Sequence, residues 1–422
     1  MSKLYTTVEW ANGANIYEVN VRQYTQEGTF KAFAAHLPRL RDMGVEIVWL
    51  MPITPISREK RLGTMGSYYA CSSYTGINPE FGTPDDFKQL VQQVHSLGMK
   101  IIIDWVANHT GYDHEWTKLH PDWFVQDAAG NFVEINGWND VIDLDYKNED
   151  MRREMIRCMQ YWVTECGIDG FRCDMAHLVP LDFWKAARIA CDAVTPLFWL
   201  AECDVIDYAD VFDVNYAWDW MHKTEAYFKQ KISLQDCVKS LDTYFNYPKG
   251  SAKLLFTTNH DENSWNGTEY EKYNGGARAL AVLSCTWPGI PLVYSGQEIP
   301  NLVRLPFFEK GALQWNGTPL LHGFYQVLLQ ERRLNKALQN GSNFIRLDVP
   351  HDKVLAWLQV KDNQKLLVAL NLSATDRLRF QLKHDQLPGT YRNIFSGLEQ
   401  KMDGVREIEL QAWEYIVYSC RN

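Results

Sequence analysis

The chain has 422 residues, 46% of them hydrophobic, so it exceeds a single typical domain and can bury a sizeable core. A formal net charge of -10 and a pI near 5.6 argue against a surface that binds nucleic acid or an anionic membrane. The 16 Trp and 21 Tyr are more than a core requires, and flat aromatic faces can stack on sugar rings.

The sequence also predicts where the protein resides. Residues 1–10 contain no basic segment followed by an apolar run, so we expect no secretory signal, and no apolar stretch reaches the length of a membrane helix. The nine cysteines are odd in number and show no Cys-x-x-Cys, which is typical of reduced core thiols in a cytoplasmic protein. A secreted protein is the alternative, and the oligomeric state stays open.

Short β-branched runs alternate with helical patterns along most of the chain. The predicted strands are 16–21, 45–51, 100–104, 170–174, 198–202, 211–215, 254–259 and 291–294. The predicted helices include 30–43, 84–97, 151–166 and 321–338. Eight strand–helix units predict an α/β protein with a (β/α)8 TIM barrel. A Rossmann-like sheet is the alternative, but no Gly-x-Gly-x-x-Gly follows any strand.

Two segments interrupt this alternation of strands and helices. Residues 109–145, after the third strand, are too long for a plain loop and predict a small insertion subdomain. Alternating short strands, at 354–360, 365–372, 378–382 and 408–418, follow the last helix and predict a C-terminal antiparallel β-sandwich over 341–422. The barrel itself is then assigned to 1–108 and 146–338.

Charged residues follow the apolar strands at the ends where a barrel carries its chemistry. They are Asp104 at the end of the third strand, Arg172 and Asp174 in the fourth, Glu202 at the end of the fifth and Asp261 after the seventh. An Arg-x-Asp on a strand is often a structural ion pair, but three carboxylates on one barrel face are costly to bury without a function. Such a set suits the cleavage of a glycosidic bond. One carboxylate attacks the anomeric carbon, a protonated carboxyl donates its proton to the leaving oxygen, and the third holds ring hydroxyls.

Four segments carry a specific resemblance to the alpha-amylase family of retaining glycoside hydrolases. They are Asp104-Trp105-Val106-Ala107-Asn108-His109, Gly170-Phe171-Arg172-Cys173-Asp174, Ala201-Glu202 and Asn259-His260-Asp261. The resemblance covers the whole chain, including the insertion and the C-terminal sandwich. It implies that Asp174 is the nucleophile, Glu202 the general acid/base and Asp261 the transition-state stabiliser.

The same resemblance implies a set of substrate-binding residues. It places Tyr69 under the sugar ring, His109 and His260 on its hydroxyls, Arg172 beside the nucleophile and Asp104 behind Arg172. The chain departs from the pattern after the nucleophile, where His177 and Leu178 stand in place of the Lys-His pair that contacts the leaving sugar in many members, and His177 is kept as a candidate substrate-binding residue. Asn108 and Asp143 match a structural calcium site of some members, while no cofactor is expected for catalysis.

Other chemistries find less support in the sequence. The segment His114-Glu115-Trp116-Thr117-Lys118 lacks the second histidine of a His-Glu-x-x-His zinc site, and no Gly-x-Ser-x-Gly elbow is present. We therefore predict an enzyme that cleaves α-1,4-glucosidic bonds in maltooligosaccharides or starch-like glucans through a covalent glycosyl-enzyme intermediate. The alternatives are an α-glucan transglycosylase that uses the same intermediate and a non-catalytic sugar-binding relative.

Overall fold

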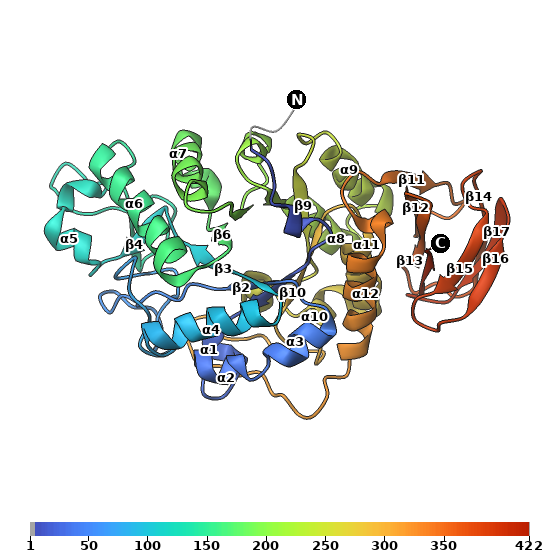
Figure 1. Cartoon of the computed structure of the whole chain (residues 1–422), viewed down its shortest axis with the longest axis horizontal. Helices are drawn as coiled ribbons and strands as arrows, with labels where there is room; N and C mark the ends of the chain where they lie inside the picture. Colours follow the sequence, from blue (N-terminus) through green and yellow to red (C-terminus); the bar gives the residue numbers. More distant parts are fainter. Residues whose placement is uncertain (1–4, 422) are drawn as a thin grey trace.

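Eight parallel strands close into a barrel in the computed structural model, which describes residues 5–421 (Figure 1). They are β1 (Ile16–Val19), β2 (Ile47–Leu50), β3 (Lys100–Trp105), β6 (Gly170–Cys173), β7 (Phe198–Ala201), β8 (Val214–Tyr216), β9 (Ala252–Leu255) and β10 (Ile290–Tyr294). Each strand lies beside the next barrel strand of the chain, and β1 pairs with β10 to complete the closure. The predicted TIM barrel is therefore confirmed. Residues 1–4 and 422, which the predicted segments include, lie outside the described residues.

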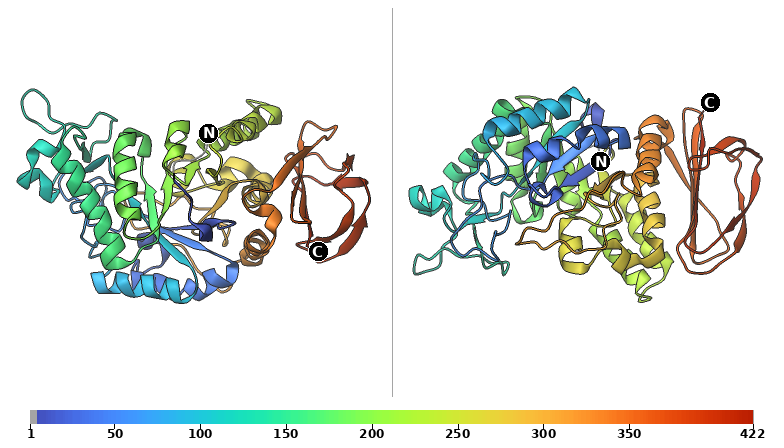
Figure 2. Two further views of the ribbon diagram at one scale, coloured as in Figure 1. Left: turned by 45° about the horizontal axis from the view of Figure 1, so that its top comes forward. Right: turned by 90° about the horizontal axis from the view of Figure 1, so that it is seen from below.

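Helices cover the outside of the barrel (Figures 1 and 2). They are α1 (Val21–Tyr24), α2 (Phe30–Ala34), α3 (Leu37–Met43), α4 (Pro84–Ser96), α6 (Glu149–Tyr161), α7 (Leu181–Asp192), α8 (Trp218–Phe228), α9 (Leu234–Tyr244), α10 (Glu269–Tyr273), α11 (Ala277–Thr286) and α12 (His322–Leu334). The predicted single helix 30–43 is wrong, because Pro38 has no N–H to bond the carbonyl of Ala34, and a new helix starts at Leu37 with this proline in its first turn. The chain therefore breaks between α2 and α3.

The connection from α6 to β6 determines where the residues after β6 and β7 lie. After α6 a short π-helical turn, Trp162–Cys166, ends at Gly167 with φ of 70°, as expected for a glycine that closes a helix. Gly170 then starts β6 opposite Phe198 of β7, and a Cβ there would meet the Phe198 carbonyl oxygen at 2.1 Å. Only glycine lets these two strands pair so closely, and these are the strands that lead into Asp174 and Glu202.

One predicted strand is shorter than expected. Residues 254–259 were predicted as the seventh strand, but β9 ends at Leu255. Its ladder with β10 stops at the pair Leu255 and Pro291, where the proline has no N–H to continue it. His260 and Asp261 consequently lie on an irregular segment past the strand end, just before the π-helical turn Glu262–Asn266.

A β-domain follows the barrel. Its six-stranded sheet has the order β11-β12-β13-β18-β15-β16, and β14 pairs with β17 beside it. The strands are β11 (Asn343–Leu347), β12 (Val354–Lys361), β13 (Gln364–Asn371), β14 (Leu378–Lys383), β15 (Gly389–Asn393), β16 (Glu399–Met402), β17 (Val405–Leu410) and β18 (Tyr415–Cys420). The predicted single strand 408–418 is wrong: Trp413 has φ of 60°, and the chain turns there so that β17 and β18 enter different sheets.

The sheet of the β-domain packs against the barrel through aromatic contacts. Trp357 meets Trp287 edge-on at 5.0 Å between ring centroids, and Trp413 stacks on Phe228 at 5.4 Å. Figures 1 and 2 place this domain at one end of the molecule and the segment with α5 (Glu115–Leu119) and the pair β4 (His109–Gly111) and β5 (Val141–Asp143) at the other. The barrel mouth is therefore bordered by the inserted segment and not by the β-domain.

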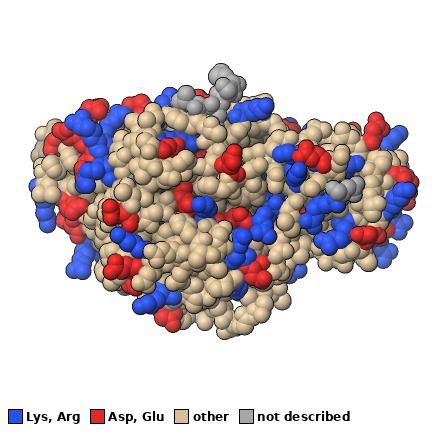
Figure 3. All heavy atoms as spheres, viewed as in Figure 1, with Lys and Arg blue, Asp and Glu red and all other residues tan. Residues whose placement is uncertain are grey.

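Within residues 5–421, no helix combines the length and apolar character needed to span a membrane. Acidic and basic side chains intermingle on the face drawn in Figure 3. Eight cysteines, from Cys71 to Cys285, are buried as free thiols in this part of the chain.

Candidate active site

Arg172 lies at the centre of a buried group of carboxylates. Its Nη1 is 2.9 Å from Asp104 Oδ1 and 2.9 Å from Asp174 Oδ1, and its Nη2 is 2.8 Å from Glu202 Oε2. The guanidinium is fully buried, with the Trp49 ring centroid 4.9 Å away. Since β6 lies between β3 and β7, one arginine reaches carboxylates from three neighbouring strands. We call Arg172, Asp104, Asp174 and Glu202 the Arg172 cluster.

Negative charge exceeds positive charge in and around this cluster. Burial raises the pKa of Asp104 to about 7 even though the Arg172 guanidinium opposes the shift. Burial likewise raises the pKa of Asp174 and of Glu202, again against Arg172. Because one guanidinium cannot stabilise three buried carboxylates, the cluster holds a proton more readily than isolated acids do. An acid that is protonated at neutral pH is what a glycosidase requires of one of its two carboxyls.

The backbone after Asp174 is strained in a way that fixes Glu202. Met175 adopts a left-handed conformation with φ of 39°, which is unfavourable for a residue with a side chain. Its N–H donates to Glu202 Oε2 at 2.9 Å, on the same oxygen that faces Arg172. Oε1 of Glu202 is thereby left as the oxygen that can carry a proton toward a leaving group.

A chain of hydrogen bonds leads from the Arg172 cluster to the other side of the barrel. The Tyr69 hydroxyl is 3.2 Å from Asp104 Oδ2 and 2.7 Å from His260 Nε2, and His260 Nδ1 hydrogen-bonds Glu18. His260 Nε2 also lies 3.3 Å from Asp261 Oδ2. Burial lowers the pKa of His260, but Asp261 and Glu18 outweigh it and raise the pKa to about 9, so the ring is an imidazolium at neutral pH.

His109 is the opposite case, a neutral histidine. Burial lowers its pKa to about 4. The Asn108 amide nitrogen lies 3.2 Å from His109 Nδ1 and 3.4 Å from Asp143 Oδ1. An ionised carboxylate can only accept hydrogen bonds, so the Asn108 amide must turn its nitrogen toward Asp143. The same nitrogen then donates to Nδ1 of His109, which accepts the hydrogen bond. The His109 proton is therefore on Nε2, where it can be donated to a hydroxyl.

The same contacts test the calcium site that the sequence suggested at Asn108 and Asp143. A calcium ligand at Asn108 would present its amide oxygen, whereas here the nitrogen faces Asp143. Asp143 Oδ2 accepts the N–H of Ile135 at 3.1 Å. Among the described residues, no group of three or more His, Cys, Asp and Glu side chains is placed to hold a metal ion. The residues at this position do not fit a calcium ion as they are arranged.

A cavity of about 380 Å³ opens above the Arg172 cluster. Asp174, Glu202 and Asp261 contribute to its floor, together with Tyr69 and His109. Its rim is aromatic and comes from loops far apart in the sequence: Trp138, Trp265, Phe307 and Phe308. Phe307 stacks on Tyr69 at 6.1 Å with the planes 18° apart, and Trp265 is 54% exposed at the mouth. Flat apolar rims above a floor of carboxylates suit a ligand with apolar ring faces and many hydroxyls.

Comparison with known proteins agrees with this geometry. The chain matches the model "Alpha amylase, catalytic domain" over residues 10–122 and 119–193, and the model "Alpha amylase, C-terminal all-beta domain" over 344–416. The crystal structure of the maltogenic alpha-amylase AmyB from Thermotoga neapolitana superposes with a TM-score of 0.89 at 30% identity, over 96% of this chain and 98% of that one. The chain belongs to the alpha-amylase family of glycoside hydrolases. The resemblance inferred from the four sequence segments is thus confirmed.

Other relatives are more distant in sequence. Alpha-amylase MalA of Haloarcula japonica is 25% identical over 397 residues, which cover 88% of this chain but 57% of that protein. Alpha-amylase 3 of Dictyoglomus thermophilum is 24% identical, with 86% of this chain and 85% of that protein covered. An alpha-amylase structure from Lactobacillus plantarum gives a TM-score of 0.86 at 29% identity, over 96% of this chain and 98% of that one. Enzymes of the alpha-amylase family need no cofactor for catalysis.

Not every residue singled out in the sequence reaches the cavity of this alpha-amylase family member. His177 is exposed on a short 3-10 turn, Ala176–Leu178, and does not line the cavity. Arg172, Asp104 and His260 do not line it either, but each contacts a residue that does. Conversely, the sequence interpretation missed Glu18, Met175 and the aromatic rim. For Glu18 a signal existed: a lone glutamate inside the apolar strand Ile16–Val19.

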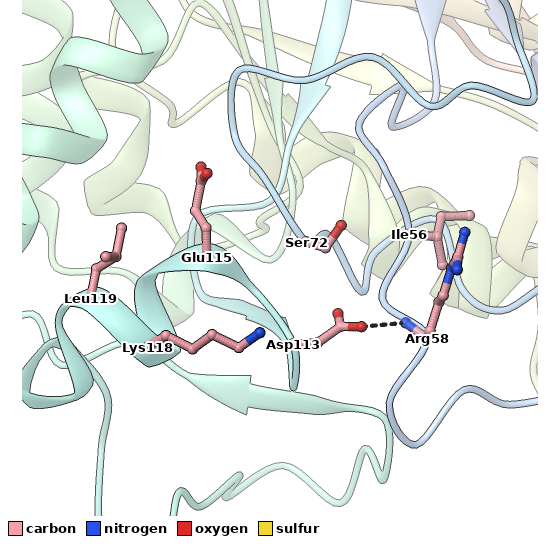
Figure 4. Close-up of a pocket in the computed structure, with 7 residues that line it drawn as sticks. All are labelled: Ile56, Arg58, Ser72, Asp113, Glu115, Lys118 and Leu119. Atoms are coloured by element: carbon pink, nitrogen blue, oxygen red, sulfur yellow. Dashed lines mark hydrogen bonds between the residues drawn. The ribbon is translucent and has the colours of Figure 1, made fainter.

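A second hollow, of about 440 Å³, lies between the loop after β2 and α5 (Figure 4). Its lining combines Arg58 and Lys118 with Asp113 and Glu115, and Asp113 Oδ2 accepts the N–H of Arg58 at 2.9 Å. It includes none of the carboxylates that contact Arg172. Size alone therefore does not mark the site; the converging carboxylates and aromatic rings do.

Proposed function

We propose that the protein hydrolyses α-1,4-glucosidic bonds in maltooligosaccharides or starch-like glucans with retention of configuration. One observation carries the proposal: Arg172 holds Asp174 and Glu202, from adjacent strands, at the floor of an aromatic-rimmed cavity. Neighbouring strands are about 4.8 Å apart, which favours the close carboxyl pair of a retaining site, about 5–5.5 Å, over the wider pair of an inverting one.

In the first step, Asp174 Oδ2 attacks the anomeric carbon while the bond to the leaving oxygen breaks. Oδ1 stays on Arg172, which keeps the other oxygen free and the carboxylate oriented. Glu202 gives its proton to the leaving oxygen, and a glycosyl ester forms on Asp174. The Glu202 carboxylate that results is stabilised by Arg172 and by the N–H of Met175.

In the second step, the Glu202 carboxylate takes a proton from water, and the water oxygen attacks the anomeric carbon. The ester bond breaks, and Asp174 leaves as a carboxylate. Asp261 holds ring hydroxyls as the sugar distorts, and the neutral Nε2–H of His109 donates to a hydroxyl of the same ring. The buried His260 imidazolium lies behind Tyr69 and Asp261 and donates from Nε2 to the Tyr69 hydroxyl. Tyr69 supports the sugar face, and Asp104 braces Arg172 from behind.

Subsidiary proposals follow from the same observations. The free, buried thiols support a cytoplasmic location. The contacts of Asn108 and Asp143 support a junction that holds without calcium. His177 contacts sugar only if a longer glucan extends past the cavity, since its side chain lies outside it.

A panel of substrates tests the activity. The protein is incubated with maltooligosaccharides, cyclodextrins, pullulan, starch and sucrose, with Asp174→Asn as the control, and the products are separated by size. Shorter maltooligosaccharides from the wild type alone are expected. Products longer than the substrate would instead indicate a transglycosylase, for which the exposed Trp265 offers a stacking surface to an acceptor sugar. No product from any of these glucans would refute the proposal.

A further inference from the structure

Glu18 is a fully buried acid in the first strand of the barrel. Its neighbours Tyr17 and Val19 pack outward with the helices, while Ile16 and Trp49, its paired residue on β2, belong to the core inside the barrel. The alternation along β1 thus turns Glu18 inward. Burial of a carboxylate at this place is costly unless it is paired and hydrogen-bonded.

Among the described residues, the carboxylate of Glu18 accepts hydrogen bonds from one residue only. Its Oε1 accepts hydrogen bonds from His260 Nδ1 and, at 3.4 Å, from the main-chain N–H of His260. Its Oε2 has no hydrogen-bond partner among the described residues. Among the described residues, both hydrogen bonds to this side chain come from a histidine 242 positions away in the sequence.

The ring of His260 transmits this contact to the cavity. With Nδ1–H donated to Glu18, Nε2 faces the Tyr69 hydroxyl at 2.7 Å and Asp261 at 3.3 Å. An imidazolium donates from both nitrogens, so the Tyr69 hydroxyl accepts from His260 and is free to donate to Asp104 at 3.2 Å. A neutral ring with its proton on Nδ1 would reverse the direction of these hydrogen bonds. Its Nε2 would then accept a hydrogen bond from the Tyr69 hydroxyl, which could no longer donate to Asp104.

We propose that Glu18 is a positioning residue of the active site, which holds His260 as an oriented imidazolium and thereby sets the direction of the hydrogen bonds through Tyr69 to Asp104. The inference rests on the proposed function, since it assigns His260 a role in hydrolysis. Glu18 does not line the cavity and acts only through His260.

The charge of His260 depends on all the groups that face it. They are Glu18 on β1, Tyr69 from the loop after β2, Asp104 from β3, Arg172 and Asp174 from β6 and its end, Glu202 after β7 and the adjacent Asp261. Burial lowers the pKa of His260, Asp261 and Glu18 raise it, and Arg172 lowers it. Removal of the Glu18 charge therefore lowers this pKa toward neutrality while Asp261 still supports it.

Glu18→Gln tests the proposal, because it keeps the shape and a hydrogen-bond acceptor but removes the charge. The ring nitrogens of His260 are followed by NMR, with the signal assigned by its loss in His260→Gln. In the wild type both nitrogens should be protonated at about pH 8, below the pKa of about 9. In Glu18→Gln the ring should titrate at least about one unit lower.

Activity should follow the same titration. Above neutral pH, kcat of Glu18→Gln should fall about tenfold or more below wild type while KM changes little, since Tyr69 then donates to His260 and no longer to Asp104, which orients Arg172 beside the reacting carboxyls. At mildly acidic pH, where the ring is charged again, kcat should recover. Glu269→Gln is the matched control: Glu269 is also buried, and it bonds Thr257 and Gln297 away from the cavity. Its pH profile should equal that of the wild type.

Two results would overturn the inference: an unchanged His260 titration in Glu18→Gln, or a lowered titration that leaves the pH profile of kcat unchanged. If Glu18→Gln fails to fold, the wild-type spectrum decides, because a single protonated ring nitrogen at about pH 8 contradicts an imidazolium. Full activity of Asp174→Asn, by contrast, would count against the proposed function and leave the His260 titration as it is.

Discussion

Two fully buried arginines of this chain bind aspartates, yet they do different things. Arg188, on α7, pairs with Asp192 and Asp213, each at 3.1 Å, and gives further hydrogen bonds to the carbonyls of Val211 and Thr6. Arg172 pairs with three carboxylates, two of which line a cavity. A buried arginine–aspartate pair alone therefore does not mark a catalytic site. The excess of carboxylates and their access to a cavity distinguish Arg172.

The largest expected effect comes from the carboxylate that Arg172 orients. Asp174→Asn should keep the fold and lose about 10⁴-fold or more in kcat, because the amide fills the same space but cannot attack. Hydrolysis of maltooligosaccharides and the melting temperature are measured together. Hydrolysis at the wild-type rate by this variant would remove Asp174 from the mechanism.

The two arginines themselves can be compared directly. Arg172→Gln should lower kcat by about 10³-fold, since Asp174 and Glu202 lose the group that orients them. Arg188→Gln should instead cost about 3–5 kcal/mol of unfolding free energy, as loss of one partner of a buried ion pair does, with kcat per folded molecule unchanged. Denaturant unfolding and active-site-normalised kinetics give both quantities. Equal losses of activity in the two variants would contradict the distinction.

The pH dependence sharpens the comparison further. Burial raises the pKa of Asp174, so hydrolysis should fall as the pH drops through that value and the nucleophile becomes protonated. Burial raises the pKa of Glu202 too, so hydrolysis should also fall as the pH rises through its value and the acid loses its proton. The acidic and basic limbs of the pH profile of kcat/KM reflect the Arg172 cluster as a whole, because its carboxyls influence each other's titration. Arg188→Gln should leave both limbs at the same pH as in the wild type. A profile with a single limb would show that one of the two roles is wrong.

The smallest effect is expected from chelation. EDTA should leave both kcat and the melting temperature unchanged, because Asn108, Asp143 and the N–H of Ile135 bond one another directly. Added calcium should not raise the melting temperature either. A clear stabilisation by calcium would mean that the Asn108 amide turns its oxygen toward a bound ion.

The sequence sufficed for the barrel and for the residues at its strand ends. Asp104, Arg172, Asp174 and Glu202 could be predicted because each lies near or directly after the carboxyl end of a short apolar strand, and strand ends meet at one face of a barrel. Local pattern was enough there, since parallel neighbours such as β6 and β7 are also consecutive barrel strands in the chain.

What was missed depends on contacts between distant segments. Glu18 meets His260 only because β1 closes the barrel on β10, and nothing near Glu18 in the sequence announces that partner. The rim rings Trp138 and Phe307 come from loops, and Trp265 comes from the π-helical turn Glu262–Asn266; no periodicity in the sequence defines the paths of these segments. In the β-domain, the turn at Trp413 requires a left-handed residue where no glycine signals it, so two strands were predicted as one.

The central claim is that Asp174 forms a covalent bond to the sugar while Glu202 supplies the proton. The most direct measurement is mass spectrometry of Glu202→Gln after reaction with an α-glucosyl fluoride, whose leaving group needs little acid assistance. The account predicts a glucosyl ester on the peptide that contains Asp174, and its absence from Asp174→Asn treated in the same way. An adduct on another residue, or a β-anomer as the first product of the wild type in proton NMR, would contradict it.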